Sequence, residues 1–251
     1  MSTEILPGSE PFSSLGGALG VLVLHGFTGS PASVYSIARA LADTGLSVEL
    51  PRLPGHGTSV ADMKTTGWSD WSTAALAAYD ELAGRSERVA VVGLSMGGGL
   101  GAYVAQSRAN VAGCVFINPL VKPPVAELLE GIDQLLEAGI DEYESIGSDI
   151  KREGSIEASY DVTPLACARS LFEGVAEVYE NLGAIAVPIL LLQSREDHVV
   201  TSDNGDDLVA LVSGPIERVW LENSYHVATM DNDQAFVEAT TVAFVQKVLG
   251  A

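Results

Sequence analysis

The sequence predicts an α/β fold in which a mostly parallel central sheet is flanked by helices. Short runs rich in Val, Leu and Ile, typical of buried strands, alternate along the 251 residues with longer segments of helical period. Strands that alternate with helices pair in parallel, because each connection crosses back over the sheet. An apolar fraction of 47% beside 18% charged residues is typical of a globular chain, and the length suits one domain.

The first half of the chain has a regular alternation. We expect strands at residues 20–24, 46–50, 89–92 and 111–117, with helices at 32–44, 68–83 and 96–108 between them. The third helix places Leu100, Tyr103 and Val104 on one face, which suits packing against a sheet. After a gap the series resumes with a strand at 189–193, a helix near 206–212, a strand at 218–221 and a last helix at 234–249.

The gap from about residue 120 to 187 interrupts this rhythm. It opens with Asn118-Pro-Leu-Val-Lys-Pro-Pro124, whose prolines restrict helix continuation and mark an exit from the sheet. Two amphipathic stripes follow, and each is typical of a packing helix or of a binding surface. The first runs through Leu128, Leu129, Ile132, Leu135 and Leu136, and the second through Leu165, Leu171, Phe172, Val175, Val178 and Leu182.

Helices inserted at this point would lie over the carboxyl ends of the strands, where open α/β sheets bind ligands. We therefore predict a helical cap at residues 120–187. The core of the same single domain is then formed by residues 1–119 and 188–251.

The charge of the chain limits its partners. A net charge of −20 repels phosphate backbones and anionic lipid surfaces, so we expect no nucleic-acid partner and no electrostatic docking to membranes. The start, Met1-Ser-Thr-Glu-Ile-Leu-Pro-Gly8, has neither the basic nor the apolar region of a secretion signal, and no apolar run is long enough to span a membrane. We expect a cytoplasmic protein with no integral membrane segment. Cys114 and Cys167 lie in apolar stretches, and nothing near them indicates a metal site or a disulfide.

The pentapeptide Gly93-Leu-Ser-Met-Gly97 is the strongest chemical signal. In a chain with 26 glycines such a Gly-X-Ser-X-Gly pattern also arises by chance, so its context decides. It lies between an expected strand and an expected helix. In so tight a turn, glycine on both sides lets the backbone pass, and the strained geometry lifts the serine hydroxyl above the sheet. We predict that Ser95 is a nucleophile rather than a serine in a glycine-rich corner.

A serine hydroxyl attacks only when a base takes its proton, and the base must be held by an acid. On a sheet of this type the order along the chain is serine, acid, histidine, each on a loop after a later strand. Of the four histidines, only His226 follows the last expected strand. Asp197 follows the strand at 189–193, so we predict Asp197 as the acid and His226 as the base.

Each competing residue has an alternative interpretation. His25 and His56 precede the serine and are expected to form hydrogen bonds within their loops, and His198 to face solvent or shape the entrance. Glu196 adjoins Asp197, and a one-residue shift of the strand end would exchange the two acids. Asp231, five residues after His226, is expected to cap the last helix.

Charge develops on the carbonyl oxygen during attack, and two aimed backbone N–H groups must stabilise it. Met96, the residue after the nucleophile, supplies one. The loop His25-Gly-Phe-Thr-Gly29 follows a strand and has glycines that let backbone approach a ligand, which nominates the amide of Phe27. The alternative is that His25-Gly26 forms a plain turn.

Five segments carry a family resemblance. They are Leu24-His-Gly-Phe-Thr-Gly29, Pro54-Gly-His-Gly57, Gly93-Leu-Ser-Met-Gly97, Ser194-Arg-Glu-Asp-His-Val-Val200 and Asn223-Ser-Tyr-His-Val-Ala-Thr-Met-Asp231. In this order they resemble the bacterial monoacylglycerol lipases and the related small carboxylesterases of the α/β-hydrolase superfamily. The last two together are much closer to the monoacylglycerol lipases than to the superfamily at large. The resemblance implies the α/β-hydrolase fold with a small helical cap that sets acyl-chain preference.

The resemblance also implies a serine esterase without a cofactor or a metal, acting on glycerol esters of one fatty acyl chain. Ser95, Asp197, His226, Phe27 and Met96 occupy the family's catalytic and oxyanion positions. The segment Asp149-Ile-Lys-Arg-Glu-Gly-Ser-Ile-Glu157 resembles the one whose acid faces the glycerol head group, which maps that role to Glu157. The alternative for Glu157 is a solvated charge in a strongly acidic chain.

Two other functions are compatible with the sequence. A general short-chain carboxylesterase shares every catalytic residue and differs only in its pocket. A non-catalytic binding module on the same scaffold has no need of serine, acid and histidine together, so the intact set favours an enzyme. The expected partner is a small lipid ester, and an apolar cap face is compatible with transient contact with lipid aggregates.

Overall fold

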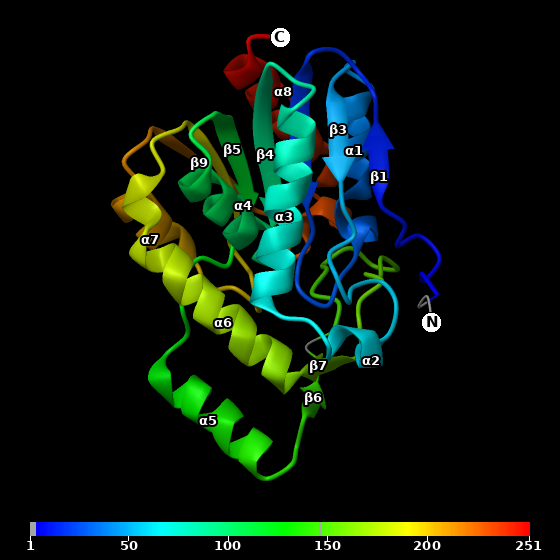
Figure 1. The fold of residues 1–251 in the computed structure, drawn as a ribbon, viewed down its shortest axis with the longest axis vertical. Helices are drawn as coiled ribbons and strands as arrows, with labels where there is room; N and C mark the ends of the chain where they lie inside the picture. Colours follow the sequence, from blue (N-terminus) through cyan, green and yellow to red (C-terminus); the bar gives the residue numbers. More distant parts are fainter. Residues whose placement is uncertain (1–3, 146) are drawn as a thin grey trace.

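The computed structural model describes residues 4–145 and 147–251. Its main sheet has seven strands in the order β1-β3-β2-β4-β5-β8-β9 (Figure 1). All neighbours pair in parallel except β1 and β3. The strands are β1 (Phe12–Ser14), β2 (Leu19–Leu24), β3 (Ser47–Leu50), β4 (Arg88–Leu94), β5 (Val111–Ile117), β8 (Ile189–Ser194) and β9 (Ile216–Leu221). The mostly parallel sheet expected from the sequence is confirmed, and the antiparallel edge strand β1 is an addition to it.

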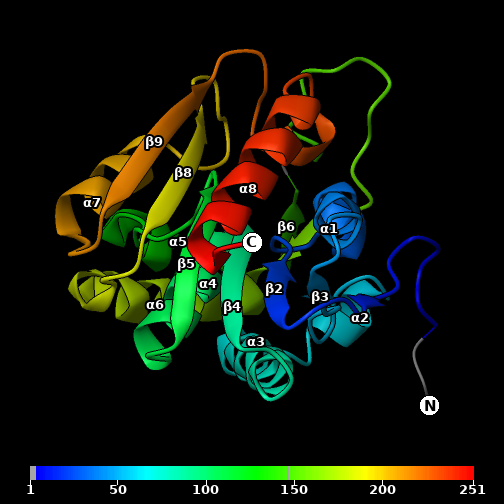
Figure 2. The ribbon, with the colours of Figure 1, turned by 90° about the horizontal axis from the view of Figure 1, so that it is seen from above.

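Helices cover both faces of the sheet (Figure 2). One face carries α1 (Tyr35–Ala42) and α8 (Gln234–Leu249), and the other α3 (Trp68–Ala83) and α4 (Met96–Ser107). Alternate residues of a strand point to opposite faces. Accordingly Val21 and Val23 lie in the core beneath α1 and α8, while Leu22 and Leu24 lie in the core beneath α3 and α4.

Short elements complete the layers. They are α2 (Val60–Met63), α7 (Asp203–Leu211) and the 3-10 helices Pro31–Val34, Leu182–Ala184 and Ala228–Met230. The single helix expected at 32–44 is divided in the structure. Its first turn is a 3-10 turn capped by Ser30, and α1 follows it.

The segment between β5 and β8 forms a cover at one end of the molecule. It contains α5 (Ala126–Glu137), the antiparallel strands β6 (Glu142–Glu144) and β7 (Val162–Pro164), and α6 (Leu165–Glu180). In Figure 1, α6 lies between α5 and the helices of the core. Both expected amphipathic helices are present, whereas the pair of short strands was not expected.

The structure also describes the cysteines, the helix lengths and the arrangement of possible metal ligands. Cys114 and Cys167 are buried free thiols, as expected. Among the described residues, no helix is long and apolar enough to cross a membrane, and no group of three or more His, Cys, Asp or Glu side chains is arranged to hold a metal ion.

Candidate active site

Ser95 occupies a strained turn between β4 and α4. Its φ is 56°, a value that side-chain-bearing residues rarely adopt. A Cβ at Gly93 would lie 2.1 Å from the Gly97 carbonyl oxygen, and a Cβ at Gly97 would lie 2.2 Å from the carbonyl oxygen of Leu24. Both glycines are therefore required by close backbone approach, which is the arrangement that the pentapeptide predicts.

Positive φ recurs at the carboxyl ends of three adjacent strands. Thr28 follows β2 with φ 60°, Ser95 follows β4, and Asn118 follows β5 with φ 43°. Among the described residues these are the three non-glycine residues with positive φ. Each such residue costs about 1–3 kcal/mol, and such strain gathers at functional sites. This edge of the sheet is the candidate site.

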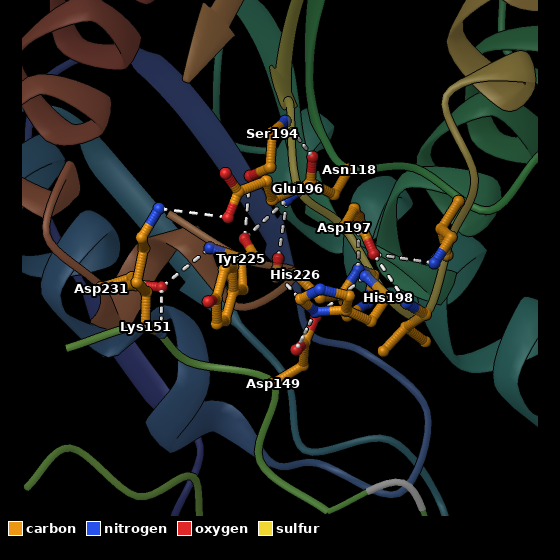
Figure 3. Close-up of polar contacts among 12 residues, drawn as sticks. Asn118, Asp149, Lys151, Ser194, Glu196, Asp197, His198, Tyr225, His226 and Asp231 are labelled. Carbon is orange, nitrogen blue, oxygen red and sulfur yellow. Dashed lines mark hydrogen bonds and ion pairs between the residues drawn. The ribbon is translucent and has the colours of Figure 1, made fainter. Parts of the chain in front are cut away.

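His226 and Asp197 form a buried pair at this edge (Figure 3). The ring Nδ1 of His226 donates to Asp197 Oδ2 at 2.8 Å, and the His226 residue is 6% exposed. The other carboxylate oxygen of Asp197 accepts the backbone N–H groups of Val199 at 2.9 Å and Val200 at 2.8 Å. With its oxygens held in this way, Asp197 fixes the tautomer of His226 that leaves Nε2 free to accept a proton.

The surroundings of His226 favour its charged form. Burial lowers the pKa of His226, but the hydrogen bond and charge of Asp197, with the charges of Glu157 and Asp149, outweigh burial and leave the pKa raised. An imidazolium that forms during a proton transfer is therefore stabilised in place.

The two nominated oxyanion amides have no competing partner. Within the described residues, neither the backbone N–H of Phe27 nor that of Met96 donates a hydrogen bond to another group of the chain. Gly26, next to Phe27, lies so close to Ser95 that an added Cβ would be 3.4 Å from the Ser95 Cβ. The loop after β2 thus runs beside the serine, with both amides free to bind a ligand oxygen.

A cavity of about 310 Å³ joins these groups. Ser95, His226 and Glu157 supply polar groups to its wall, and Phe27, Leu120, Leu171, Phe172 and Val200 are among its apolar lining residues. The Ser95 hydroxyl makes no hydrogen bond among the described residues. A contact between nucleophile and base often tightens only when substrate binds.

The cavity continues under the cover. Leu128, Thr163, Ala168 and Phe172 line it and also line a larger groove of about 730 Å³ between α5, the β6-β7 pair and α6. Apolar side chains dominate this groove, so the space beyond the polar end suits a long apolar chain.

Glu157 lies in the cavity wall rather than in solvent. Its Oε1 accepts the hydroxyl of Ser33 at 2.5 Å, and a Cβ at Gly29 would lie 2.9 Å from the same oxygen. Burial raises the pKa of Glu157, although the bond from Ser33 and the charge of His226 oppose that effect. The alternative of a solvated charge does not fit this position.

The competing histidines lie outside the pair. His25 is buried, and its Nε2 accepts the Leu53 N–H at 3.1 Å while its Nδ1 donates to the Gly26 carbonyl. His56 is buried and donates to the carbonyl of Pro54. His198 is 56% exposed at its side chain and pairs with Asp149 at 2.8 Å. Loop bonding for the first two and solvent exposure for the third are confirmed.

The two competing acids, Glu196 and Asp231, form no hydrogen bond with the His226 ring. Glu196 is 56% exposed at its side chain and pairs with Lys151, so it is Asp197 that meets His226. The expectation that Asp231 caps the last helix is wrong, because Asp233 occupies the cap position of α8 and makes no capping bond. Asp231 is fully buried, and its carboxylate instead accepts four backbone N–H groups, those of Lys151, Arg152, Tyr225 and Asn232.

Sequence reasoning missed Asn118 and Asp149. The Asn118 side chain donates to the His226 carbonyl at 2.7 Å and accepts the Ser194 N–H at 2.7 Å. The Asp149 carboxylate accepts the N–H of His226 at 3.1 Å. The polar amide directly after a buried strand is the sequence signal that could have indicated Asn118. No local pattern marks Asp149, because its partners are distant in sequence.

The chain is similar to known ester hydrolases over most of its length. A sequence profile of the Alpha/beta hydrolase family matches residues 21–239. The chain belongs to the α/β-hydrolase family. It is 40% identical over 248 residues to a thermostable monoacylglycerol lipase of Bacillus sp. (strain H-257), and the match covers 98% of each chain. It is 27% identical over 253 residues to a carboxylesterase of Bacillus subtilis (strain 168), covering 95% of this α/β-hydrolase and 97% of that relative.

Solved structures agree with this assignment. One, described with two metagenome-derived lipolytic enzymes, LipS and LipT, has a TM-score of 0.93 at 40% identity and covers 97% of this chain and 100% of that one. The structure of Paleococcus ferrophilus monoacylglycerol lipase has a TM-score of 0.77 at 15% identity and covers 95% and 99%, which shows a shared fold. The predictions of an α/β-hydrolase fold and of a carboxylic ester hydrolase are confirmed.

Proposed function

We propose that this α/β-hydrolase cleaves esters of glycerol with a single fatty acyl chain. The observation that carries the proposal is one cavity with two unlike ends. At one end Ser95, His226 and Glu157 supply polar groups, and at the other the wall is apolar and continues into the groove under α5. A ligand with a compact polar head and one long apolar chain matches this division. Similarity to a thermostable monoacylglycerol lipase supports the same substrate class.

The first half of the proposed reaction transfers the acyl group to the enzyme. The hydroxyl of Ser95 attacks the ester carbonyl while Nε2 of His226 takes its proton, and Asp197 stabilises the imidazolium. The amides of Phe27 and Met96 stabilise the negative carbonyl oxygen. Collapse of this intermediate breaks the bond to glycerol, which leaves with the proton from His226.

The second half releases the acid. Water enters the place that glycerol has left, His226 takes a proton from it, and the resulting hydroxide attacks the acyl-Ser95 ester. The same two amides stabilise the second oxyanion. The Ser95 oxygen then recovers its proton from His226, and the free fatty acid departs through the apolar groove.

Glu157 is proposed to bind the glycerol head group. A carboxyl oxygen accepts hydrogen bonds from hydroxyl groups, and one of the two Glu157 oxygens already accepts the hydroxyl of Ser33. A glycerol ester with one acyl chain has two free hydroxyls, whereas a triester has none. The polar end therefore favours the mono-ester.

Residues 120–187 are proposed to act as a cap over residues 1–119 and 188–251. Leu128 of α5 and Phe172 of α6 line the cavity, so this segment supplies the wall that contacts the acyl chain. Val125 and Leu128 of this segment are also large exposed apolar residues. We propose that they make transient contact with lipid aggregates as the substrate enters.

A substrate series tests the proposal. Monoacylglycerols of increasing chain length are compared with the matching diacylglycerols, triacylglycerols and simple short-chain esters, with Ser95→Ala as the blank. We expect strong preference for the mono-esters and a loss on the order of 10⁴-fold or more in Ser95→Ala. Equal or better turnover of small simple esters would instead make the protein a general carboxylesterase, and no Ser95-dependent hydrolysis would overturn the proposal.

The role of Glu157 has its own matched comparison. Glu157→Gln is expected to raise KM for a monoacylglycerol roughly tenfold, because a charged hydrogen-bond partner is lost. KM for a simple methyl ester of the same acid should not change, since that ester lacks the head group. Glu153→Gln, an exposed acid of the same segment, is the control and should leave both values unchanged. An equal change for both esters in Glu157→Gln would remove head-group binding from the proposal.

A further inference from the structure

Asp149 binds the loops of both the acid and the base. One oxygen of its carboxylate, Oδ2, accepts the backbone N–H of His198 and that of His226, each at 3.1 Å. The other oxygen accepts the His198 ring nitrogen at 2.8 Å, and the Asp149 carbonyl accepts the Val227 N–H at 3.1 Å. The Asp149 side chain is only 9% exposed. One side chain from the proposed cap thus connects residue 198, next to Asp197, with His226.

The backbone of His226 is held from two sides. Asn118, at the end of β5, donates to its carbonyl oxygen, and Asp149 accepts from its N–H. Asn118 is buried in the core, whereas Asp149 belongs to the inserted segment. One contact therefore comes from the core of the sheet, and the other depends on the position of the inserted segment.

Residues 149–157 are seated on the base loop by further bonds. The N–H groups of Lys151 and Arg152 donate to the buried carboxylate of Asp231, and the Ser155 hydroxyl donates to the carbonyl of Met230. At the end of the same stretch, Glu157 reaches the cavity. The stretch that carries the proposed head-group acid is thus the one that also carries Asp149.

We propose that Asp149 is a positioning residue that aligns His226 when residues 149–157 are seated, so that seating of the cap and alignment of the base occur together. This inference rests on the proposed function, in which His226 is the base. Without Asp149 the N–H groups of His198 and His226 lose their acceptor, and the loop that carries the base is held from the Asn118 side alone. A small displacement of a catalytic base is enough to slow proton transfer strongly.

The negative charge of Asp149 supports His226 in addition to its hydrogen bond to the His226 backbone. The charged groups that face His226 are Asp197 from the loop after β8, and Glu157 and Asp149 from the inserted segment, and all three help to keep its pKa raised. Asp149 itself faces the ring of His198, whose pKa it raises through their hydrogen bond. Tyr225 packs edge-on against that ring, and Lys151 lies over the Tyr225 ring and pairs with Glu196.

The test is the pH profile of kcat and kcat/KM for Asp149→Asn. Removing the negative charge lowers the pKa of His226, so the acid limb of kcat/KM should move to lower pH. Asp149→Ala also removes the acceptor that both N–H groups share. We expect its kcat to fall about tenfold or more on both a monoacylglycerol and a simple ester, with little change in KM. Asp161→Asn, an exposed acid of the same inserted segment, is the control and should leave kcat and the limb unchanged.

Two more variants separate position from charge. Asp149→Glu keeps the charge on a longer side chain, so the acid limb should stay near that of the wild type while kcat falls. His198→Gln changes an exposed side chain and removes the cation that offsets Asp149, so the limb should move slightly to higher pH. Should Asp149→Ala and Asp149→Asn fail to fold, Asp149→Glu is decisive, and a normal kcat in that variant overturns the inference.

The two proposals fail in different ways. A wild-type protein without Ser95-dependent hydrolysis contradicts the proposed function. An active wild type together with an Asp149→Ala variant of normal kcat and unmoved acid limb contradicts the positioning role alone. A loss of thermal stability without a shift of the limb reduces Asp149 to a structural residue and also overturns the inference.

Discussion

The two helices of the inserted segment, α5 and α6, look alike in sequence and differ in the structure. The α6 helix buries one whole face, comprising Leu165, Cys167, Ala168, Leu171, Gly174, Val175 and Val178. The α5 helix buries only Ile132 and leaves Leu128 48% exposed. An amphipathic stripe therefore shows that a helix has an apolar face, but the surface available to that face decides whether it becomes core or cover.

The closeness of packing explains the difference. A Cβ at Gly174 would lie 2.0 Å from the Trp68 ring, so α6 approaches α3 at van der Waals contact through this glycine. In α5, a Cβ at Gly131 would meet nothing within 4 Å. The floor of the cavity thus belongs to the rigid core, and its outer wall belongs to a helix that packs mainly on α6. Substrate entry is expected to move α5 and to leave α6 in place.

The largest expected effect is that of Gly174→Ala. The added methyl group forces the Trp68 ring or α6 to shift, and overpacking of this kind costs about 3 kcal/mol or more. For a chain of this length the melting temperature should fall by roughly 6–12 °C in a thermal unfolding scan. Gly131→Ala is the matched control in α5, where the gain in helix propensity should leave stability unchanged or raise it by up to about 1 kcal/mol. Equal effects of the two variants would contradict the comparison.

The second-largest effect is expected at acidic pH, which should lower the stability of the core around His25 and His56. His25 and His56 lie in a buried cluster with Phe27 and Trp71 of α3, and burial lowers their pKa values to about 3 and about 4. Their folded-state pKa values lie below the unfolded value of 6.5, so the unfolded chain binds protons first as pH falls. Each histidine should therefore remove about 1.4 kcal/mol of stability per pH unit between about pH 6 and pH 4.

Urea unfolding of the wild type and of His56→Gln at several pH values measures this effect. The variant should lose about half of the histidine-dependent slope. Phe236→Ser, an exposed change on α8, should leave the slope as it is. A wild-type stability that is flat between pH 6 and pH 4 would show that the two rings are not kept neutral by burial.

The smallest effect on stability is expected for Leu128→Ser in α5. Its side chain is largely exposed, so the free energy of unfolding should change by about 0.5 kcal/mol or less. Because Leu128 also lines the cavity, KM for long-chain esters should rise while KM for short-chain esters stays the same. Ile140→Ser, at another exposed apolar residue of the inserted segment, is the control. A Leu128→Ser variant that unfolds as readily as Gly174→Ala would place α5 in the core.

The sequence predicted what depends on local pattern and chain order. The strands β2, β4, β5 and β8 contain buried apolar runs, and the turn at Ser95 is fixed by its glycines. Asp197 was chosen because it follows a strand, and it does contact His226. The strands β1, β6 and β7 were not predicted, because each has only three residues and no periodicity can be read from them.

The rest of the site depends on contacts between distant segments. The side chain of Asp149 binds backbone groups 49 and 77 residues away, and no property of its neighbours indicates them. The position of Asp231 before α8 predicts a helix cap, but its buried carboxylate instead accepts two backbone N–H groups of its own loop and two of residues 151–152. Acidic residues that hold loops together therefore need the fold before their role can be stated.

Positive φ has a consequence for how the chain can evolve, and it occurs at Thr28, Ser95 and Asn118. Each withholds about 1–3 kcal/mol from a protein whose total stability is expected to be about 5–15 kcal/mol. Selection for heat resistance alone would replace Thr28 by glycine and relax the edge, whereas selection for turnover would keep it. Asn118 differs, because its buried side chain binds the backbone of Ser194 and His226. Laboratory evolution under each demand in turn should therefore diverge first at Thr28.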